Sequence, residues 1–129
     1  MKMGMEPDPA AFDVLLVEDD VDVRETLGIA LTDEGYRAAL VSDGLSALEW
    51  LRTHPGPRLI LLDWMMPRCG GESFLRQRAL DPTFADVPTV VVSADARVRE
   101  AAAVRSVAAV LLKPVDLETI LATVCRYCS

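Results

Sequence analysis

The run 59–63 (Leu-Ile-Leu-Leu-Asp) most constrains what this chain can fold into. Four consecutive large aliphatic residues are apolar on both faces and too few for a helix, which is typical of a central strand in a parallel sheet. Pro67 and Gly70-Gly71 follow it and interrupt regular structure. Asp63 is therefore predicted at the carboxyl end of a buried strand, where open α/β sheets bind ligands. A strand-end turn or helix cap is the alternative role for this acid.

Strand-like segments alternate with helical patterns along the rest of the chain. Further strands are expected at 12–17, 36–41, 89–92 and 110–112, and the helical segments are centred on 23–31, 45–51, 71–80, 96–107 and 117–124. Five successive βα units with short connections predict one α/β domain, in which a doubly wound parallel sheet is covered by helices on both faces. The crossovers should be right-handed.

Polar residues and glycines at the segment ends indicate where the helices start and stop. Asp19 or Asp20 suits the start of the first helix, Ser42 or Asp43 that of the second, and Asp116 that of the last. The expected inward-facing stripes include the following apolar residues: Val23, Leu27, Ala30 and Leu31; Leu45, Leu48 and Leu51; Phe74 and Leu75; and Leu117, Ile120, Leu121 and Val124.

Length and charge narrow the class of protein. The 129 residues suit one domain, expected from residue 11 to 129 after a flexible tail at 1–10 that lacks the apolar core of a signal peptide. With 20 acidic and 13 basic residues, the net charge of -7 argues against direct nucleic-acid or anionic-membrane binding. No apolar run approaches the roughly 20 residues of a membrane-spanning helix. The cytoplasm is the expected compartment.

Cysteine and histidine residues add little chemistry of their own. Cys125 and Cys128 are spaced for one face of a helix at the end of the chain, which favours packing over redox function. A structural zinc site would need two more soft ligands, and the only histidine, His54, is far away in sequence. His54 is expected to be an exposed loop residue, the alternative being a phosphocarrier or a base.

Chemically active side chains follow four of the predicted strands. Glu18, Asp19 and Asp20 are three adjacent acids, more than one helix cap requires, and their mutual repulsion favours a divalent cation between them. Mg²⁺ is suitable because it prefers oxygen ligands. A carboxylate can accept a phosphoryl group as a nucleophile when a cation neutralises the charge, while an ammonium and a hydroxyl bind the phosphoryl oxygens. The set therefore suits phosphoryl transfer, and comprises Glu18, Asp19, Asp20, Asp63, Ser93 and Lys113.

Four motifs in order make the chain similar to a bacterial two-component response-regulator receiver domain, of the stand-alone kind typified by the chemotaxis regulator. They are VLLVEDD at 14–20, LLDWMMP at 61–67, VVSA at 91–94 and LLKP at 111–114, and the resemblance runs from about Phe12 to Tyr127. It implies a flavodoxin-like fold with strand order 2-1-3-4-5.

The resemblance also implies metal and phosphoacceptor roles. Asp63 matches the aspartate that accepts a phosphoryl group from the phosphohistidine of a histidine kinase. Asp19 matches a direct Mg²⁺ ligand and Glu18 a residue acting mainly through water, with the Met65 carbonyl completing the protein ligands. Asp20 lies one position beyond this pair and is expected either to cap the helix or to hydrogen-bond to the ligands without contacting the metal.

Two further matches and two departures concern the switch. Ser93 matches the switch Ser/Thr, and Lys113 matches the lysine of the family motif, with a cis peptide bond expected before Pro114. Val110 stands where similar domains carry Tyr or Phe, so the coupled movement of an aromatic ring should be altered. The side chain of Met65 cannot hydrogen-bond an attacking water, which predicts a longer-lived phosphate.

The leading hypothesis is a Mg²⁺-dependent signalling switch phosphorylated on Asp63 by a histidine kinase or phosphotransfer protein. It would signal through contacts with an unidentified downstream protein and could form a homodimer linked to phosphorylation, without enzymatic activity beyond self-phosphorylation and autodephosphorylation. The alternative is a pseudo-receiver, an interaction module with little or no regulated phosphorylation. A flavodoxin-like or phosphatase enzyme ranks lowest, because the chain lacks a Gly-rich phosphate loop and a second Asp two residues after Asp63.

Overall fold

A computed structural model describes residues 11–54, 56–64, 69–104 and 107–128. Within these ranges five strands and five helices alternate along the chain, as the sequence predicts. The strands are β1 (Val14–Val17), β2 (Ala38–Val41), β3 (Leu59–Asp63), β4 (Thr89–Ser93) and β5 (Ala109–Leu112), and the helices are α1 (Val21–Asp33), α2 (Gly44–Thr53), α3 (Gly71–Ala79), α4 (Val98–Val104) and α5 (Leu117–Cys128).

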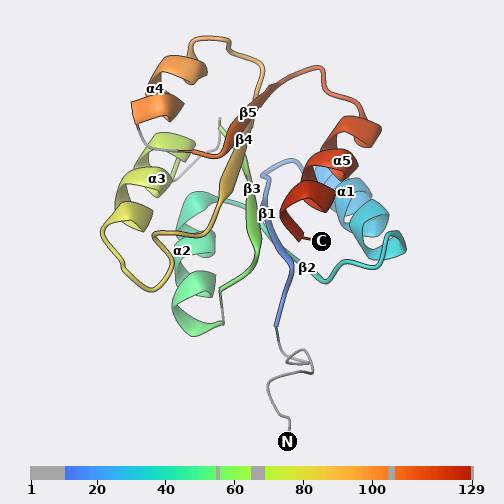
Figure 1. The fold of residues 1–129 in the computed structure, drawn as a ribbon, viewed down its shortest axis with the longest axis horizontal. Helices are drawn as coiled ribbons and strands as arrows, with labels where there is room; N and C mark the ends of the chain where they lie inside the picture. The colour runs from blue at the N-terminus through green and yellow to red at the C-terminus, as the bar shows by residue number, and fades with distance from the viewer. Residues whose placement is uncertain (1–10, 55, 65–68, 105–106, 129) are drawn as a thin grey trace, which may run out of the picture.

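The strands form one parallel sheet in the order β2-β1-β3-β4-β5, which confirms the predicted α/β topology. β3 lies in the centre between β1 and β4, and all five of its residues are buried. Helices α2, α3 and α4 lie on one side of the sheet, and α1 and α5 on the other (Figure 1). Because helices cover both faces of the sheet at β3, apolar side chains are buried on both faces of this strand.

Two hydrophobic cores fill the spaces between the sheet and these two layers. Successive residues of a strand point to opposite faces, so Leu15 and Val17 belong to the core under α2, α3 and α4, while Val14 and Leu16 belong to the core under α1 and α5. Phe74 of α3 is fully buried in the first core. The central strands are thereby held rigidly between two packed layers.

Side-chain caps begin three of the helices at the carboxyl edge of the sheet. The carboxylates of Asp20, Asp43 and Asp116 accept backbone N–H bonds from residues three positions later, at 3.1, 2.8 and 2.8 Å. Each satisfies an amide of the first helical turn that has no partner within the helix. The prediction of caps at these three starts is confirmed, and after α1 the chain turns at Gly35 with a φ of 91°.

Three apolar residues predicted to face inward are exposed instead. Val23, Leu45 and Leu117 are 40, 42 and 41% exposed, and each lies in the first turn of its helix. In a βα unit the helix starts at the carboxyl edge of the sheet, so side chains of this turn can project beyond the strands. The buried stripe therefore begins later in each of these three helices. α4 begins at Val98, two residues after its predicted start.

His54 is not the exposed loop residue expected from the sequence. Its ring stacks on that of Trp50 at a centroid distance of 4.2 Å and an interplanar angle of 7°, because four residues in a helix bring the two side chains together. Its Nδ1 lies 2.8 Å from the carbonyl oxygen of Trp50. The half-buried His54 is therefore part of an aromatic cluster that also includes Phe12.

The cysteine pair divides between packing and exposure. Cys128 is buried in the core under α5, and its thiol donates to the carbonyl of Asp13 at 3.7 Å, as predicted for a packing role. Burial raises the pKa of the Cys128 thiol to about 11. Cys125 is exposed, so the packing prediction is wrong for this residue.

Among the described helices, none has the length and apolar character needed to cross a bilayer. The predicted tail at 1–10 lies outside the described residues.

Candidate functional site

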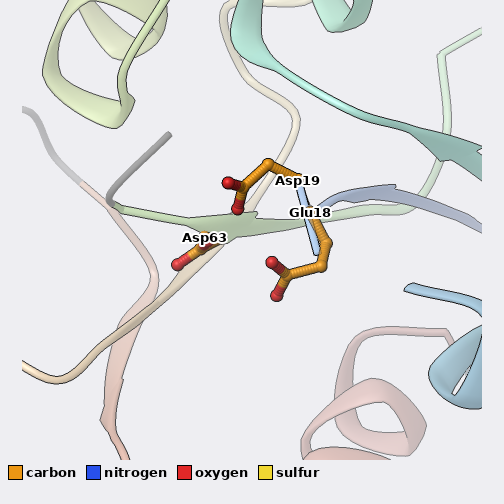
Figure 2. A group of neighbouring side chains, drawn as sticks. All are labelled: Glu18, Asp19 and Asp63. Carbon is orange, nitrogen blue, oxygen red and sulfur yellow. The ribbon is translucent and has the colours of Figure 1, made fainter. Parts of the chain in front are cut away.

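Three carboxylates meet at the carboxyl ends of β1 and β3. Glu18 and Asp19 directly follow β1, and Asp63 is the last residue of β3. Because Val17 is paired in register with Leu62, the two strands deliver their acids to the same place. One carboxylate oxygen of each residue lies within 4.8 Å of those of the other two. Figure 2 shows the three side chains at the ends of β1 and β3. Glu18 and Asp63 are buried and Asp19 is exposed.

Burial changes the acid–base behaviour of this group. Burial is the main cause that raises the pKa of Glu18 to about 7; a hydrogen bond from the Asp20 amide opposes the shift, and the negative charge of Asp63 contributes to it. Burial also raises the pKa of Asp63, opposed mainly by the positive charge of Lys113. Two buried carboxylates therefore share a region in which a bound cation would be stabilising.

Lys113 and Ser93 come to the same edge from β5 and β4. The Lys113 ammonium lies 3.5 Å from Oδ1 of Asp63, forming an ion pair in which the Asp63 side chain is 8% exposed. The Lys113 amide donates to the carbonyl of Ser93 at 2.7 Å, which joins the two strand ends. Ser93 follows Val92, the register partner of Asp63, and is buried. Its hydroxyl oxygen accepts the Asp95 amide at 3.0 Å and retains its own proton for donation.

The residues around this group explain its rigidity. Asp20 acts as the N-cap of α1, as one of the sequence alternatives proposed, and its amide donates to Oε2 of Glu18 at 3.1 Å. The Trp64 amide donates to the carbonyl of Val92 at 3.0 Å. The Trp64 ring lies so close to Gly71 that a Cβ added to Gly71 would be 2.5 Å from ring carbon Cε3. The Trp64 side chain is thus packed against the start of α3.

The sequence did not predict that Arg24 contacts the loop carrying Glu18 and Asp19. The Arg24 Nη1 donates to the carbonyls of Glu18 at 2.9 Å and Asp19 at 3.4 Å. The available signal was an arginine in the first turn of a helix whose start is predicted at the acids. Helical geometry alone does not indicate that this side chain folds back over the preceding loop.

A cavity of about 710 Å³ adjoins the acids between α1 and α5. Its lining is mainly aliphatic, and it includes Val23 of α1 and Leu117 of α5, whose exposure was described above. Glu18, Asp63 and Lys113 also line it. The Asp63 carboxylate therefore lies beside an apolar surface.

The donor set is suitable for a hard divalent cation. Glu18, Asp19 and Asp63 together offer carboxylate oxygens only, which are the ligands that Mg²⁺ prefers, and the exposure of Asp19 leaves room for retained waters. The predicted fourth ligand, Met65, lies outside the described residues.

The predicted switch position and cis bond can both be located. The Lys113–Pro114 peptide bond is cis, as expected. Val110 is paired in register with Val91 and packs, half-buried, against the core under α2, α3 and α4. A valine in this position has no ring to move between buried and exposed orientations.

Comparisons with known proteins agree with this geometry. The family model described as "Response regulator receiver domain" matches residues 14–125. The response regulator MprA of Mycobacterium leprae is 39% identical over 113 residues, covering 86% of this chain and 48% of that protein. The chain thus spans about half the length of the curated relatives it matches.

Solved structures show the same fold. The chemotaxis protein CheY4 of Vibrio cholerae superposes with a TM-score of 0.82 at 24% identity, covering 92% of this chain and 99% of that one. The receiver domain of the sensor histidine kinase PA1611 from Pseudomonas aeruginosa superposes with a TM-score of 0.78 at 28% identity, covering 92% and 98%. That structure is described with a magnesium ion coordinated in its active-site cleft. With its sequence match, its sheet order and its acidic edge, this chain belongs to the response regulator receiver domain family.

Proposed function

We propose that this receiver domain is a phosphorylation-dependent switch that accepts a phosphoryl group on Asp63. One observation carries the proposal: buried Asp63 lies at the sheet edge with oxygens of Glu18 and Asp19 within 4.8 Å and the Lys113 ammonium 3.5 Å away. A buried acid beside two others is costly to ionise, and it is useful where a cation and a transferred phosphoryl group share the site. The proposed donor is the phosphohistidine of a histidine kinase or phosphotransfer protein.

The proposed transfer is a displacement at phosphorus. The Asp63 carboxylate oxygen forms the new P–O bond as the P–N bond to the donor imidazole breaks, and the imidazole recovers a proton from solvent. Mg²⁺ held by Glu18, Asp19 and Asp63 would neutralise charge on the phosphoryl oxygens. Lys113 and the Ser93 hydroxyl would bind these oxygens.

The proposal does not make the chain a turnover enzyme. Asp63 is consumed by the transfer and regenerated only when water hydrolyses the acyl phosphate, so the residues promote self-phosphorylation and autodephosphorylation. Met65 has a side chain that cannot orient the attacking water, and we therefore propose slow hydrolysis.

The partner that delivers the phosphoryl group must contact the surface around Asp63. Exposed Val23 and Leu117 line the cavity that adjoins the acid. Apolar side chains of a partner can bury against them, which stabilises a complex through removal of apolar surface from water. A downstream protein and a homodimer linked to phosphorylation are further proposed partners.

The decisive experiment is phosphorylation by a small donor. Incubation with acetyl phosphate and Mg²⁺ should add one phosphate to the intact protein, seen by mass spectrometry, and none to Asp63→Asn. Asp33→Asn, at an exposed position near the end of α1, is the matched control and should be phosphorylated like the wild type. An unmodified wild-type mass would overturn the proposal.

A pseudo-receiver remains the second candidate, because Val110 replaces the expected ring. Amide chemical shifts of the phosphorylated protein discriminate the two functions. In a switch, shifts change in α4 and β5 as well as around Asp63, since the two conformations differ there. Changes confined to the residues around Asp63 would favour the pseudo-receiver.

A further inference from the structure

Arg24 connects helix α1 to the loop that carries two of the three acids. One nitrogen of its guanidinium donates to the carbonyls of both Glu18 and Asp19, at 2.9 and 3.4 Å. We propose that Arg24 is a positioning residue that orients Glu18 and Asp19 for Mg²⁺ binding. This inference rests on the proposed function only in taking Mg²⁺ as the cation of the site.

The two carbonyl contacts restrict the backbone from which the acids project. Glu18 is buried, and its carboxylate is further held by the Asp20 amide at 3.1 Å. Asp19 is exposed, so packing restricts its side chain less and its direction depends more on the backbone. The Glu18 carbonyl belongs to the peptide plane before the Asp19 Cα and the Asp19 carbonyl to the plane after it, so the two contacts restrain both planes from which the Asp19 side chain projects.

The position of Arg24 on α1 makes this restraint part of the fold. The Arg24 amide donates to the Asp20 carbonyl at 2.9 Å, within the first turn after the N-cap. The backbone of Arg24 is thus held by the helix while its side chain reaches back to the end of β1. Residues that orient metal ligands in this way commonly have large effects on affinity.

Positioning and charge predict opposite effects of removing Arg24. The guanidinium is positive and lies beside the acids, so charge alone would repel Mg²⁺, and its removal would strengthen binding. If Arg24 orients the acids, its removal weakens binding. The sign of the change in affinity therefore separates the two roles.

The test is a Mg²⁺ titration of folded variants by isothermal calorimetry, repeated through Trp64 fluorescence. Arg24→Gln is expected to raise the Kd for Mg²⁺ by about 10-fold. Arg24→Lys keeps the charge but not the planar guanidinium, and is expected to raise the Kd by a smaller factor. Arg76→Gln, an equal charge change at an exposed position of α3, should leave it unchanged.

Phosphorylation kinetics provide a second readout. At saturating Mg²⁺ the rate of Arg24→Gln with acetyl phosphate should return to that of the wild type, because only Mg²⁺ binding is impaired. A Kd for Arg24→Gln that is unchanged or lower than in the wild type overturns the inference, even if the variant is less stable to heat. Should Arg24→Gln fail to fold, an unchanged Kd in Arg24→Lys has the same consequence. A wild type that binds Mg²⁺ but is not phosphorylated overturns the proposed function alone.

Discussion

At the scale of residues, Glu18 and Asp63 are unusual because both are buried carboxylates next to each other. Glu18 is 5% exposed and Asp63 is 7% exposed, and burial is the first cause of the raised pKa of each. Lys113 compensates Asp63 in part through the 3.5 Å ion pair. The metal-free site is therefore electrostatically unfavourable at neutral pH, which is a condition that a bound divalent cation relieves.

The stability of the metal-free protein should depend on this acid. The folded-state pKa of Glu18, about 7, lies above its ordinary value of 4.5, so its contribution to stability is fully present below pH 4.5 and is lost as the pH rises through 7. Glu18→Gln does not titrate. We expect it to unfold with a free energy about 1 to 2 kcal/mol above that of the wild type at pH 8, and with little pH-dependent gain at pH 4.5.

Urea unfolding with EDTA at the two pH values measures this difference. Glu25→Gln, an exposed position on α1, controls for the loss of one negative charge. Equal effects of Glu18→Gln at both pH values would show that Glu18 is not the titrating group.

At the scale of elements, a close backbone contact with Cys69 determines how α2 begins. The Gly44 amide donates to the carbonyl of Cys69 at 3.1 Å, and a Cβ on Gly44 would lie 2.5 Å from that oxygen. α2 can therefore begin beside Cys69 only because its first residue has no side chain.

Gly44→Ala should therefore destabilise the fold. The added methyl group meets backbone rather than a flexible side chain, so the start of α2 or the segment at Cys69 has to shift. We expect a loss of about 1 to 3 kcal/mol in the free energy of unfolding, measured by urea denaturation. Gly56→Ala is the matched control, since its Cβ would meet its nearest neighbour at 3.8 Å. Equal stability of Gly44→Ala and the control would contradict the predicted clash.

At the scale of the whole molecule, the two layers of helices leave different surroundings at the carboxyl edge. α1 and α5 border the cavity of about 710 Å³ beside the acids, and their first turns expose apolar side chains. The three carboxylates that follow or end β1 and β3, and the Lys113 ammonium that follows β5, lie at the same edge. The fold thereby places an exposed apolar surface next to the Asp63 carboxylate.

Charge placed on this surface should separate partner recognition from chemistry. Leu117→Asp is expected to slow transfer from a phosphohistidine protein by about 10-fold or more, because the complex loses apolar contact and buries a charge. Phosphorylation by acetyl phosphate, which needs no docking, should be unaffected. Both rates are measurable by the appearance of phosphorylated protein on Phos-tag gels. Leu80→Asp, at an 81% exposed position after α3, is the control. Equal slowing with both donors would place the effect in the chemistry.

Much of this architecture could be predicted from the chain itself. The buried run at β3 and the alternation of strand and helix patterns led to the parallel sheet, and acids at the ends of β1 and β3 led to the cluster of three carboxylates. Patterns of this kind are readable because hydrophobic periodicity and strand ends are local properties of the sequence. The exposure of Val23 and Leu117 could not be read, because it depends on where the sheet ends beneath each helix.

By itself the sequence determined which residues meet at the sheet edge, since parallel strands bring their carboxyl ends together. Only the tertiary structure decided how they are held. Arg24 reaches back to the carbonyls of Glu18 and Asp19, and His54 stacks on Trp50 rather than facing solvent. Such contacts depend on the directions that long side chains take once the backbone is folded, and these directions leave no periodic signal in the sequence.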